Sequence, residues 1–410
     1  MSHDIDSALI RDFDLRRLPQ GFYADPFPYY AALRAREPVK RMPDGSILLT
    51  RYRDIEYVYK NPKLFSSDKR IEFKLKFGDS PLFEHHTTSL VFNDPPLHSR
   101  VRRLVSGPLT PKAIAAIEPD LIVLVDRLLD RLQSAGGGDL IEDFAAAIPI
   151  EVIGNLLGVP QTERGPLREW SLSILGALEP NLSETAAARG NAAVGEFSTY
   201  LDGLIAARRT QGRDASQDLL SRLIDGESDG ERLSVTELIQ NCIFLLNAGH
   251  ETTTNLIGNG LVLLAGNPVE RARLIAEPAL IKPAVEEFLR YESSNQLGNR
   301  ITTQSVEIGG IALAALTPIT LCIGAANRDP EQFPQPDALN IARTPNRHLA
   351  FGSGIHQCAG TGVARLEGSI AIGRFVQRFP HYRPTAQPVR GGRARFRGFL
   401  NVPVSVSPAR

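Results

Sequence analysis

The sequence predicts a mainly α-helical protein with a minor β portion, and three observations indicate this class. Apolar residues recur at the helical period through most of the chain. Strand-like runs are short and gather mainly in the last third of the sequence. Neither an internal repeat nor a linker rich in glycine, serine or proline divides the 410 residues. We therefore expect one domain spanning residues 1–410.

The predicted helices are marked by proline or cap residues at their starts and by polar or glycine-rich ends. Pro26 and the Asn267-Pro268 pair open two of them, and the triplet of residues 136–138 closes another. In chain order the predicted helices cover residues 26–36, 54–60, 111–133, 144–157, 161–178, 184–209, 238–265, 268–276 and 280–291.

Strands and loops complete the prediction. Residues 66–93 mix Phe, Lys and His without a period and predict a long loop, and loops of that length usually carry a function such as binding. Polar breaks at 210–217 and 226–230 predict surface loops. The predicted strands cover residues 46–51, 304–308, 319–323 and 402–406.

Composition excludes several classes of protein. The 46 Lys and Arg residues balance 46 Asp and Glu residues, so the chain lacks the basic footprint of a nucleic-acid binder. Three widely spaced cysteines make neither a disulfide framework nor a four-thiolate zinc site and favour a reducing compartment. The acidic N-terminus shows no secretory signal, and segment 238–265 is too polar for a membrane span. We expect a soluble, cytoplasmic monomer.

The strongest motif is Phe351-Gly-Ser-Gly-Ile-His356-Gln-Cys358-Ala-Gly360, followed by apolar residues at the helical period. Its glycines allow a tight turn with backbone amides pointing inward. The start of the following helix favours a thiolate at Cys358 through its dipole and its N–H donors. Such a sulfur suits a soft or borderline metal. The plain alternative is a buried, inert cysteine.

This stretch resembles the haem-ligand loop of the cytochrome P450s, and three further motifs agree with that family in order and spacing over nearly the whole chain. The resemblance implies the cytochrome P450 fold, with haem b (iron protoporphyrin IX) buried between the long central helix and the helix after the cysteine. It implies that Cys358 is the axial ligand of the haem iron and that Phe351 packs on the thiolate side. In this family the thiolate pushes electron density that favours O–O cleavage.

The second motif is Ala248-Gly249-His250-Glu251-Thr252, inside the long apolar helix. An acid beside a hydroxyl in such a helix costs free energy unless it is satisfied, and small residues at 248 and 249 let a flat ligand approach the backbone. By the resemblance, Ala248 and Gly249 contact haem, while Glu251 and Thr252 are catalytic and deliver protons during oxygen activation. The alternative is a polar stripe that faces solvent. For His250 we expect a structural role.

The third motif places Glu287 and Arg290 three residues apart, on one helix face. In the family this is a structural ion pair behind the haem, which an arginine of a downstream proline-containing segment usually completes. Here Ala338 stands where that arginine is common. Either Arg343 or a backbone group could take its place.

The fourth set would hold the haem propionates, because two carboxylates at a core edge need several donors. By family match these donors are His98, Arg102, Arg300 and His356. The plain alternative for each is a solvated surface group. The resemblance also predicts substrate contacts, and Asn247, Asn295 and Gln296 suggest a polar feature on the ligand. The predicted substrate contacts are Phe244, Asn247, Leu297 and Phe399.

Together these motifs predict a haem-thiolate monooxygenase that inserts one oxygen atom from O₂ into a small or medium organic substrate by hydroxylation or dealkylation. Electrons would come from a ferredoxin fed by an NAD(P)H-dependent reductase, docked near Arg347 and Arg365. Two alternatives remain. A peroxide-driven haem enzyme has no need of the Glu251–Thr252 pair, and a non-catalytic haem sensor or carrier would keep only Cys358.

Overall fold

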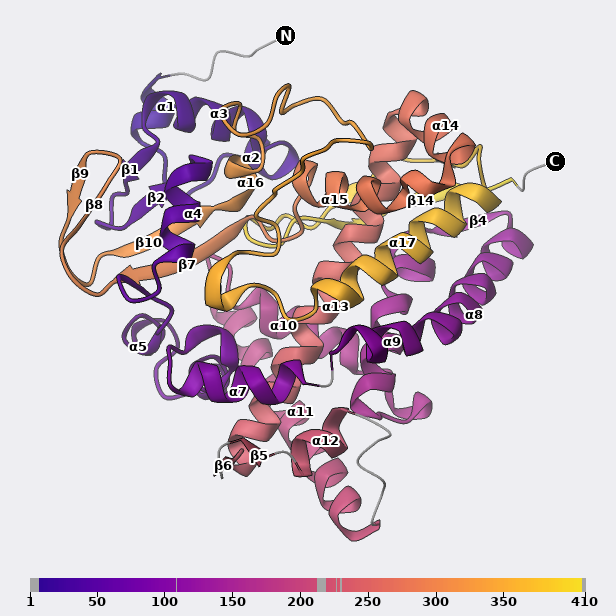
Figure 1. Ribbon diagram of the computed structural model, residues 1–410, viewed down its shortest axis with the longest axis horizontal. Coiled ribbons are helices and arrows are strands. Elements are labelled where there is room, and N and C mark those ends of the chain that lie inside the picture. The colour runs from indigo at the N-terminus through magenta and orange to yellow at the C-terminus, as the bar shows by residue number, and fades with distance from the viewer. Residues whose placement is uncertain (1–6, 108, 212–218, 226, 229–230, 408–410) are drawn as a thin grey trace.

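The computed structural model describes residues 7–107, 109–211, 219–225, 227–228 and 231–407. Helices make up most of it, as predicted, and a smaller sheet lies at one side next to the N-terminal helices (Figure 1). The predicted breaks at 210–217 and 226–230 lie largely outside the described residues. Within the second break lies the short strand β5 (Glu227–Ser228), which pairs antiparallel with β6 (Glu231–Arg232) just after it.

The helices agree with the prediction in most places. The segment predicted as a helix over 144–157 begins instead with a π-helical turn at Ile141–Ala145, and the segment 161–178 is split by a loop. The α-helices are α1 (Ser7–Arg11), α2 (Gln20–Ala24), α3 (Phe27–Arg36), α4 (Tyr52–Lys60), α5 (Arg70–Phe77), α6 (Pro81–Thr88), α7 (Leu97–Ser106), α8 (Pro111–Ala135), α9 (Ala147–Leu157), α10 (Leu167–Gly176), α11 (Glu184–Gln211), α12 (Leu219–Asp225), α13 (Val235–Gly266), α14 (Pro268–Ala276), α15 (Ile281–Tyr291), α16 (Ile323–Ala326) and α17 (Thr361–Arg378).

Helix α13 is the axis of the molecule (Figure 1). It begins with a capping box in which the Ser234 hydroxyl accepts from the Glu237 amide and the Glu237 carboxylate accepts from the Ser234 amide. The first half of α13 packs into a hydrophobic cluster with α10, α11 and α12, and the second half into another with α8, α15 and α17. Burial on both sides explains why α13 is apolar around most of its circumference.

The main sheet has five strands in the order β1-β2-β10-β7-β3. Strands β2 and β10 are parallel and the other neighbours are antiparallel. β7 was not predicted, because polar Asn299 and Arg300 interrupt its apolar pattern. The remaining strands are β1 (Val39–Arg41), β2 (Ile47–Leu49), β3 (Phe65–Ser66), β4 (Gly137–Asp139), β7 (Leu297–Thr302), β8 (Val306–Ile308), β9 (Ile311–Leu313), β10 (Pro318–Cys322), β11 (Arg383–Pro384), β12 (Val389–Arg390), β13 (Phe399–Asn401) and β14 (Pro403–Ser405).

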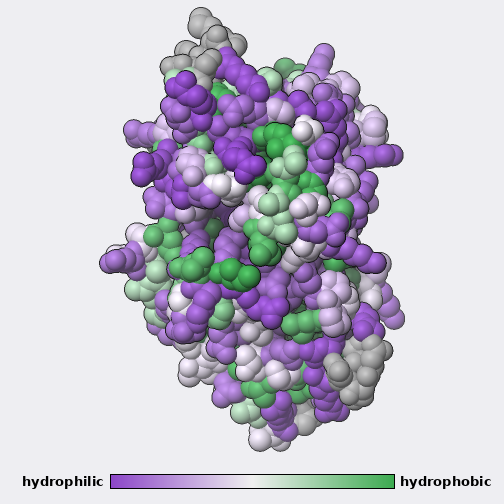
Figure 2. Space-filling model, turned by 90° about the vertical axis from the view of Figure 1, so that its left-hand side faces the viewer, coloured by the Kyte–Doolittle hydropathy of each residue, from purple (hydrophilic) through white to green (hydrophobic). Residues whose placement is uncertain are grey.

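The prediction of a loop over 66–93 is wrong, because this segment forms α5, α6 and a 3₁₀ turn at Leu90–Phe92. In α5, Phe73 is buried, but Ile71 and Leu75 are 67% and 87% exposed, whereas Lys69 just before the helix is buried. Apolar residues therefore lie on both the buried and the exposed face, which hides the helical pattern. Figure 2 shows the face that carries the sheet, where apolar side chains form patches on a mainly hydrophilic surface.

None of the helices in the described ranges is both long and apolar enough to cross a membrane. This agrees with the expectation for the segment 238–265, which lies within α13 and carries buried polar side chains.

Candidate functional site

Cys358 lies in a tight turn just before α17. Gly352 and Gly354 adopt positive φ angles of 65° and 70°, and a Cβ atom on Gly354 would lie 2.2 Å from the Tyr59 carbonyl oxygen. Only glycine fits there. The Cys358 amide donates to the Phe351 carbonyl at 2.9 Å, which closes the turn. The sequence therefore fixes the position of the sulfur through the glycines of the motif.

The Cys358 thiol is set apart from the other two cysteines, since Cys242 and Cys322 are buried and Cys358 is exposed. The surrounding protein nevertheless raises the pKa of this thiol by burial, while the Gly360 amide, the Thr361 hydroxyl, Arg102 and Arg365 favour the thiolate. The donors around the sulfur fit a thiolate that binds a metal.

Four basic side chains gather beside this turn, as the sequence predicted. The rings of His98 on α7 and His356 lie 4.0 Å apart, and both nitrogens of His98 and the Nε2 of His356 are buried without a partner. Burial, together with the charges of Arg300, His98 and Arg102, lowers the pKa of His356 to about 2. Burial likewise lowers the pKa of His98, Arg102 and Arg300. Each positive charge in this cluster disfavours the charge on its neighbours. The cluster is therefore suited to bind an anionic group, such as the propionates of haem.

On α13, Glu251 and Thr252 follow each other in the middle of the molecule. The Thr252 hydroxyl donates to the Ala248 carbonyl at 2.6 Å, and the Ser294 hydroxyl donates to the Thr252 carbonyl at 2.7 Å. The contact with Ser294 joins α13 to the segment after α15, and no pattern in the sequence indicates it. The oxygen of Thr252 keeps its lone pairs free to accept from a water molecule or ligand.

The Glu251 carboxyl is buried, and its two oxygens differ. One oxygen accepts from the guanidinium of Arg393, and the other has no partner in the described structure. Burial raises the pKa of Glu251 to about 7, although Arg393 lowers it. A carboxyl with this pKa can both donate and accept a proton near neutral pH. The sequence did not identify Arg393, which is 142 residues from Glu251 and carries no motif.

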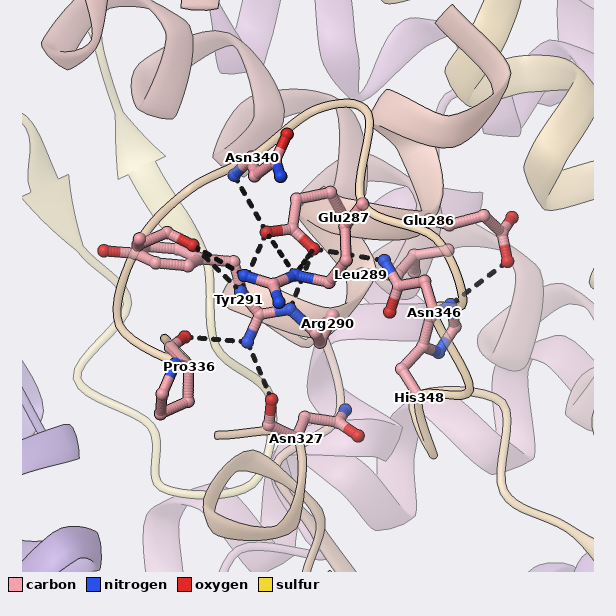
Figure 3. Close-up of polar contacts among 12 residues, drawn as sticks. Glu286, Glu287, Leu289, Arg290, Tyr291, Asn327, Pro336, Asn340, Asn346 and His348 are labelled. Atoms are coloured by element: carbon pink, nitrogen blue, oxygen red, sulfur yellow. Dashed lines mark hydrogen bonds and ion pairs between the residues drawn. The ribbon is translucent and has the colours of Figure 1, made fainter. Parts of the chain in front are cut away.

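The Glu287–Arg290 pair is fully buried (Figure 3). Arg290 donates to both oxygens of Glu287 at 2.8 Å and also to the carbonyls of Asn327 and Pro336. The place of the missing arginine at Ala338 is taken by Arg343, whose Nε lies 3.2 and 3.1 Å from the two Glu287 oxygens. Backbone groups contribute as well, since the Ala338 carbonyl accepts from Arg290 at 3.3 Å. Arg343 and a backbone carbonyl, the two possible replacements for the arginine that is usual at position 338, therefore both take part.

We expect Arg343→Ala to destabilise the protein, because it removes donors from a carboxylate that is fully buried. The loss in the free energy of unfolding should be about 1–3 kcal/mol, the cost of leaving a buried polar group without its partner, and thermal unfolding measures it. Arg347→Ala is the matched control, because Arg347 is exposed and contributes only its backbone carbonyl to Tyr52. Equal unfolding temperatures for both variants would show that the contacts of Arg343 with Glu287 are dispensable.

The structure places the remaining predicted residues differently. Gly249 is needed for packing against α9, since a Cβ atom there would lie 2.6 Å from the side chain of Ile153. Leu297 and Phe399 are buried in hydrophobic clusters, which gives them a role in the core, and Phe244 is partly buried against the cluster of the first half of α13. This packing supports neither the predicted haem contact of Gly249 nor the predicted substrate contacts of Leu297 and Phe399.

Asn247 and His250 are buried residues of α13 in which every side-chain polar atom lacks a partner in the described structure. Asn247 is 1% exposed, and neither atom of its amide group has a partner in the described structure. Both ring nitrogens of His250 are also unpartnered, and burial lowers the pKa of His250 to about 3, so this side chain is neutral. An amide one turn before Glu251 is a group that a ligand could satisfy.

The fold and this site define a haem-thiolate protein. The model of the family described as Cytochrome P450 matches residues 178–401. The chain belongs to the cytochrome P450 family, whose members are monooxygenases that bind haem b through a cysteine thiolate.

Relatives and solved structures agree with this assignment. A vitamin D(3) 25-hydroxylase of Pseudonocardia autotrophica is 38% identical over 395 residues, which cover 94% of this chain and 95% of the relative. A 6-deoxyerythronolide B hydroxylase of Saccharopolyspora erythraea is 36% identical over 370 residues, which cover 88% and 90%. The structure of P450BioI in complex with an acyl carrier protein ligated to hexadec-9Z-enoic acid has a TM-score of 0.89 and 34% identity, and covers 94% of this chain and 99% of that one.

Proposed function

We propose that this protein is a monooxygenase that hydroxylates or dealkylates a small or medium organic substrate with O₂ and electrons from a ferredoxin. The observation that carries the proposal is the pair on α13, in which a buried carboxyl, that of Glu251 with a pKa of about 7, is followed directly by Thr252, whose hydroxyl donates to the Ala248 carbonyl. Such a pair suits proton delivery to a reaction in the interior. A peroxide-driven enzyme or a haem carrier has no use for it.

Four groups of residues have roles in this proposal. Cys358 would ligate the iron, with Phe351 beside the turn. His98, Arg102, Arg300 and His356 would hold the propionates, and Ala248 would let the haem plane approach α13. Haem bound there supplies the binding and reductive activation of O₂, with the thiolate favouring O–O cleavage.

The substrate is proposed to be mainly apolar, with one polar group that satisfies Asn247. The named relatives act on vitamin D(3) and 6-deoxyerythronolide B, and the P450BioI structure holds a fatty acid on a carrier protein. A buried amide with no protein partner favours a ligand that offers both a donor and an acceptor.

The electron donor is proposed to dock on the cysteine side, near exposed Arg347. Arg365 lies on the same side but is paired with Glu286 at 2.6 Å, so it contributes less free positive charge. None of the three cysteines forms a disulfide in the described structure, and a thiolate ligand must stay reduced until haem binds, which supports a cytoplasmic location.

The proposal is tested by screening a compound library for a low-to-high spin shift of the haem absorption band and then by assaying the hits with a surrogate ferredoxin, a reductase and NAD(P)H. We expect substrate-dependent NAD(P)H use with formation of an oxygenated product. Product formation with hydrogen peroxide alone would favour the peroxide-driven alternative. Tight binding of hits with no product from either route would favour a sensor or carrier.

Haem retention tests the role of Arg102. If Arg102 pairs with a propionate, Arg102→Leu leaves a buried carboxylate short of a donor, which costs about 1–3 kcal/mol. We expect faster loss of haem on dilution or gel filtration. Arg103→Leu is the control, because Arg103 is the next residue on α7 and is exposed. Equal haem retention and unfolding temperature in the two variants would place Arg102 outside the haem site.

A further inference from the structure

Helix α5 and the residue before it place two lysines on the same face as the buried ring of Phe73, since residues 69, 73 and 76 are spaced by four and three. Lys69 is 2% exposed, and its ammonium group lies 2.5 Å from the carboxylate of Glu72. Lys76 donates to the Glu179 carbonyl at 2.8 Å, and no ion pair is found for it in the described residues. Moving an ammonium group out of water costs free energy, so two lysines on this face indicate a function rather than a stabilising role.

A third cation, Arg395, lies between β12 and β13 and acts on both lysines, because its charge lowers the pKa of Lys69 and, together with burial, that of Lys76 to about 8. Its guanidinium donates to the Leu178 and Leu297 carbonyls at 3.2 and 2.8 Å and to the side-chain oxygen of Asn299. All three acceptors are neutral. A guanidinium has five N–H donors, so two of those of Arg395 remain for a ligand.

The acidic side chains around these cations do not balance them. Two carboxylates, those of Glu72 and Glu179, act on the charge of Arg395. Glu72 pairs with Lys69, whereas the Glu179 carboxylate accepts from three consecutive backbone amides, of which Arg395 contributes the middle one. Among the described residues two carboxylates thus face three cations, the third being Lys76, and one positive charge is left without a counter-charge.

A buried histidine adds an unused polar atom beside this cluster. His86 on α6 is 2% exposed, and its Nε2 has no partner in the described structure. Burial and the charges of nearby basic groups, Lys76 and Arg395 among them, hold the pKa of His86 well below its usual range, so the ring is neutral. Three aromatic rings have their centroids 5.5–5.7 Å from that of His86, namely Phe73, Phe77 and Phe92. The surroundings therefore offer a polar atom and an apolar wall next to the cations.

Backbone hydrogen bonds connect Arg395 to the part of α13 that carries Thr252. The Arg395 carbonyl accepts from the Gln296 amide at 2.8 Å. Ser294, two residues earlier, donates from its hydroxyl to the Thr252 carbonyl at 2.7 Å. The charge of Arg300, one of the predicted propionate donors, also acts on the lysine before α5. The cluster therefore adjoins the proposed reaction site on the side of Thr252.

We propose that the substrate is an organic acid whose carboxylate binds Arg395, with Lys76 and His86 beside it. This rests on the proposed function and deepens it, because it adds an acidic group to a substrate that is otherwise mainly apolar. A carboxylate offers two coplanar oxygens, which suit two N–H groups of one guanidinium. It also supplies the negative charge that the cluster lacks, and the carbon skeleton of the acid would extend toward Thr252.

The first test compares ligands that differ only in the acidic group. A straight-chain, an aromatic and a polycyclic acid (dodecanoic, naphthoic and abietic acid), each with its methyl ester, are titrated into the haem-loaded protein at about pH 7. Dissociation constants are measured from the spin shift and by calorimetry. A pocket without a counter-charge would favour the ester, because an ionised carboxylate loses its hydration on binding. We expect at least one acid to bind about tenfold or more tightly than its ester.

Variants assign this preference to the cluster. In Arg395→Gln the acid and its ester should differ by less than about threefold, and Arg395→Lys, which keeps the charge but not the fork of donors, should retain part of the preference. Because each comparison is made between two ligands in one variant, a general loss of packing affects both alike. Lys76→Gln tests the cluster from another element and should also lower the preference for the acid. Lys74→Gln is its matched control, since Lys74 lies on the same helix, is exposed and pairs with Asp79.

The outcomes separate this inference from the proposed function, because binding is measured without any supply of electrons. Tighter binding of every ester than of its acid in the wild type, or an unchanged preference in both Arg395→Gln and Lys76→Gln, would overturn the carboxylate site. An equal loss of preference in Lys74→Gln and Lys76→Gln would do the same. Selective binding of acids with no oxygenated product from any of them would instead refute the proposed function alone.

Discussion

Replacing Cys358 with serine is expected to remove the absorption band of a thiolate-ligated haem in the reduced, CO-treated protein. Cys358 is the exposed cysteine in a turn whose donors favour the thiolate, and a serine hydroxyl supplies no soft sulfur ligand. Product formation should fall by more than about a hundredfold, since even groups that only support a metal ligand are worth about 10–100-fold. Absorption spectra and product yield measure both effects.

Two further variants make this test specific. Cys358→His offers a nitrogen ligand, so the band should move while haem stays bound. Cys242→Ala changes a cysteine that is buried in the cluster around the first half of α13, and its spectrum should match the wild type. A thiolate-type spectrum that persists in Cys358→Ser would show that another residue ligates the iron.

Much of the fold and part of the site could be predicted from the sequence. The long helices are predictable because their apolar residues keep the helical period against a continuous core, as in α8, α11 and α13. Cys358 was identifiable because its glycines are required by local geometry, including the close approach of Gly354 to Tyr59. The basic residues His98, Arg102, Arg300 and His356 could be predicted as a set because they occur along the chain in the same order as the matching residues of the family.

What the sequence did not reveal depends on tertiary contacts. Helix α5 was missed because its apolar Ile71 and Leu75 face solvent, and β7 was missed because a central strand here carries Asn299 and Arg300. Arg343 stands five residues after the position where the family usually has its arginine, so only the folded chain shows that it reaches Glu287.

The partner of Glu251 shows the same limit at the site. Arg393 is brought to this carboxyl by the packing of the C-terminal segment on α10 and α13, and no local pattern connects two residues so far apart in sequence. For Gly249, which was predicted to contact haem, the structure shows a close approach to Ile153 of α9 that the sequence did not indicate. Motifs thus suggest candidate residues, but they do not reveal which neighbours lie against them.

Removing the hydroxyl of Thr252 is expected to separate electron consumption from product formation. Haem binding, substrate binding and electron uptake do not use this hydroxyl, so Thr252→Ala should keep consuming NAD(P)H. Without the hydroxyl to position a water molecule, proton delivery fails and reduced oxygen leaves as hydrogen peroxide. Product per NAD(P)H should fall while peroxide rises, and Thr252→Ser, which keeps a hydroxyl, should resemble the wild type.

In the proposed proton path, the Glu251 carboxyl lies between solvent and Thr252. Its removal should therefore lower the rate of turnover. Glu251→Gln keeps the size of the side chain but cannot take up and release a proton. A general acid–base group contributes about 10²–10⁴-fold to the rate of a reaction. The pKa of Glu251 is raised to about 7, mainly by burial, so the proton-donating form is present below that pH and is lost as the pH rises through it. The ratio of product to peroxide should therefore fall across this range in the wild type and stay flat in Glu251→Gln.

These outcomes distinguish a proton path from a packing role. The Thr252 hydroxyl bonds the Ala248 carbonyl, so a purely structural role predicts that Thr252→Ala lowers the unfolding temperature and leaves the product per NAD(P)H unchanged. A proton path predicts the reverse, with a small change in stability and a large change in partition toward peroxide. Full product yield with no excess peroxide in Thr252→Ala would show that the hydroxyl serves helix packing alone. A ratio of product to peroxide that does not depend on pH in the wild type would show that Glu251 does not take part in proton delivery.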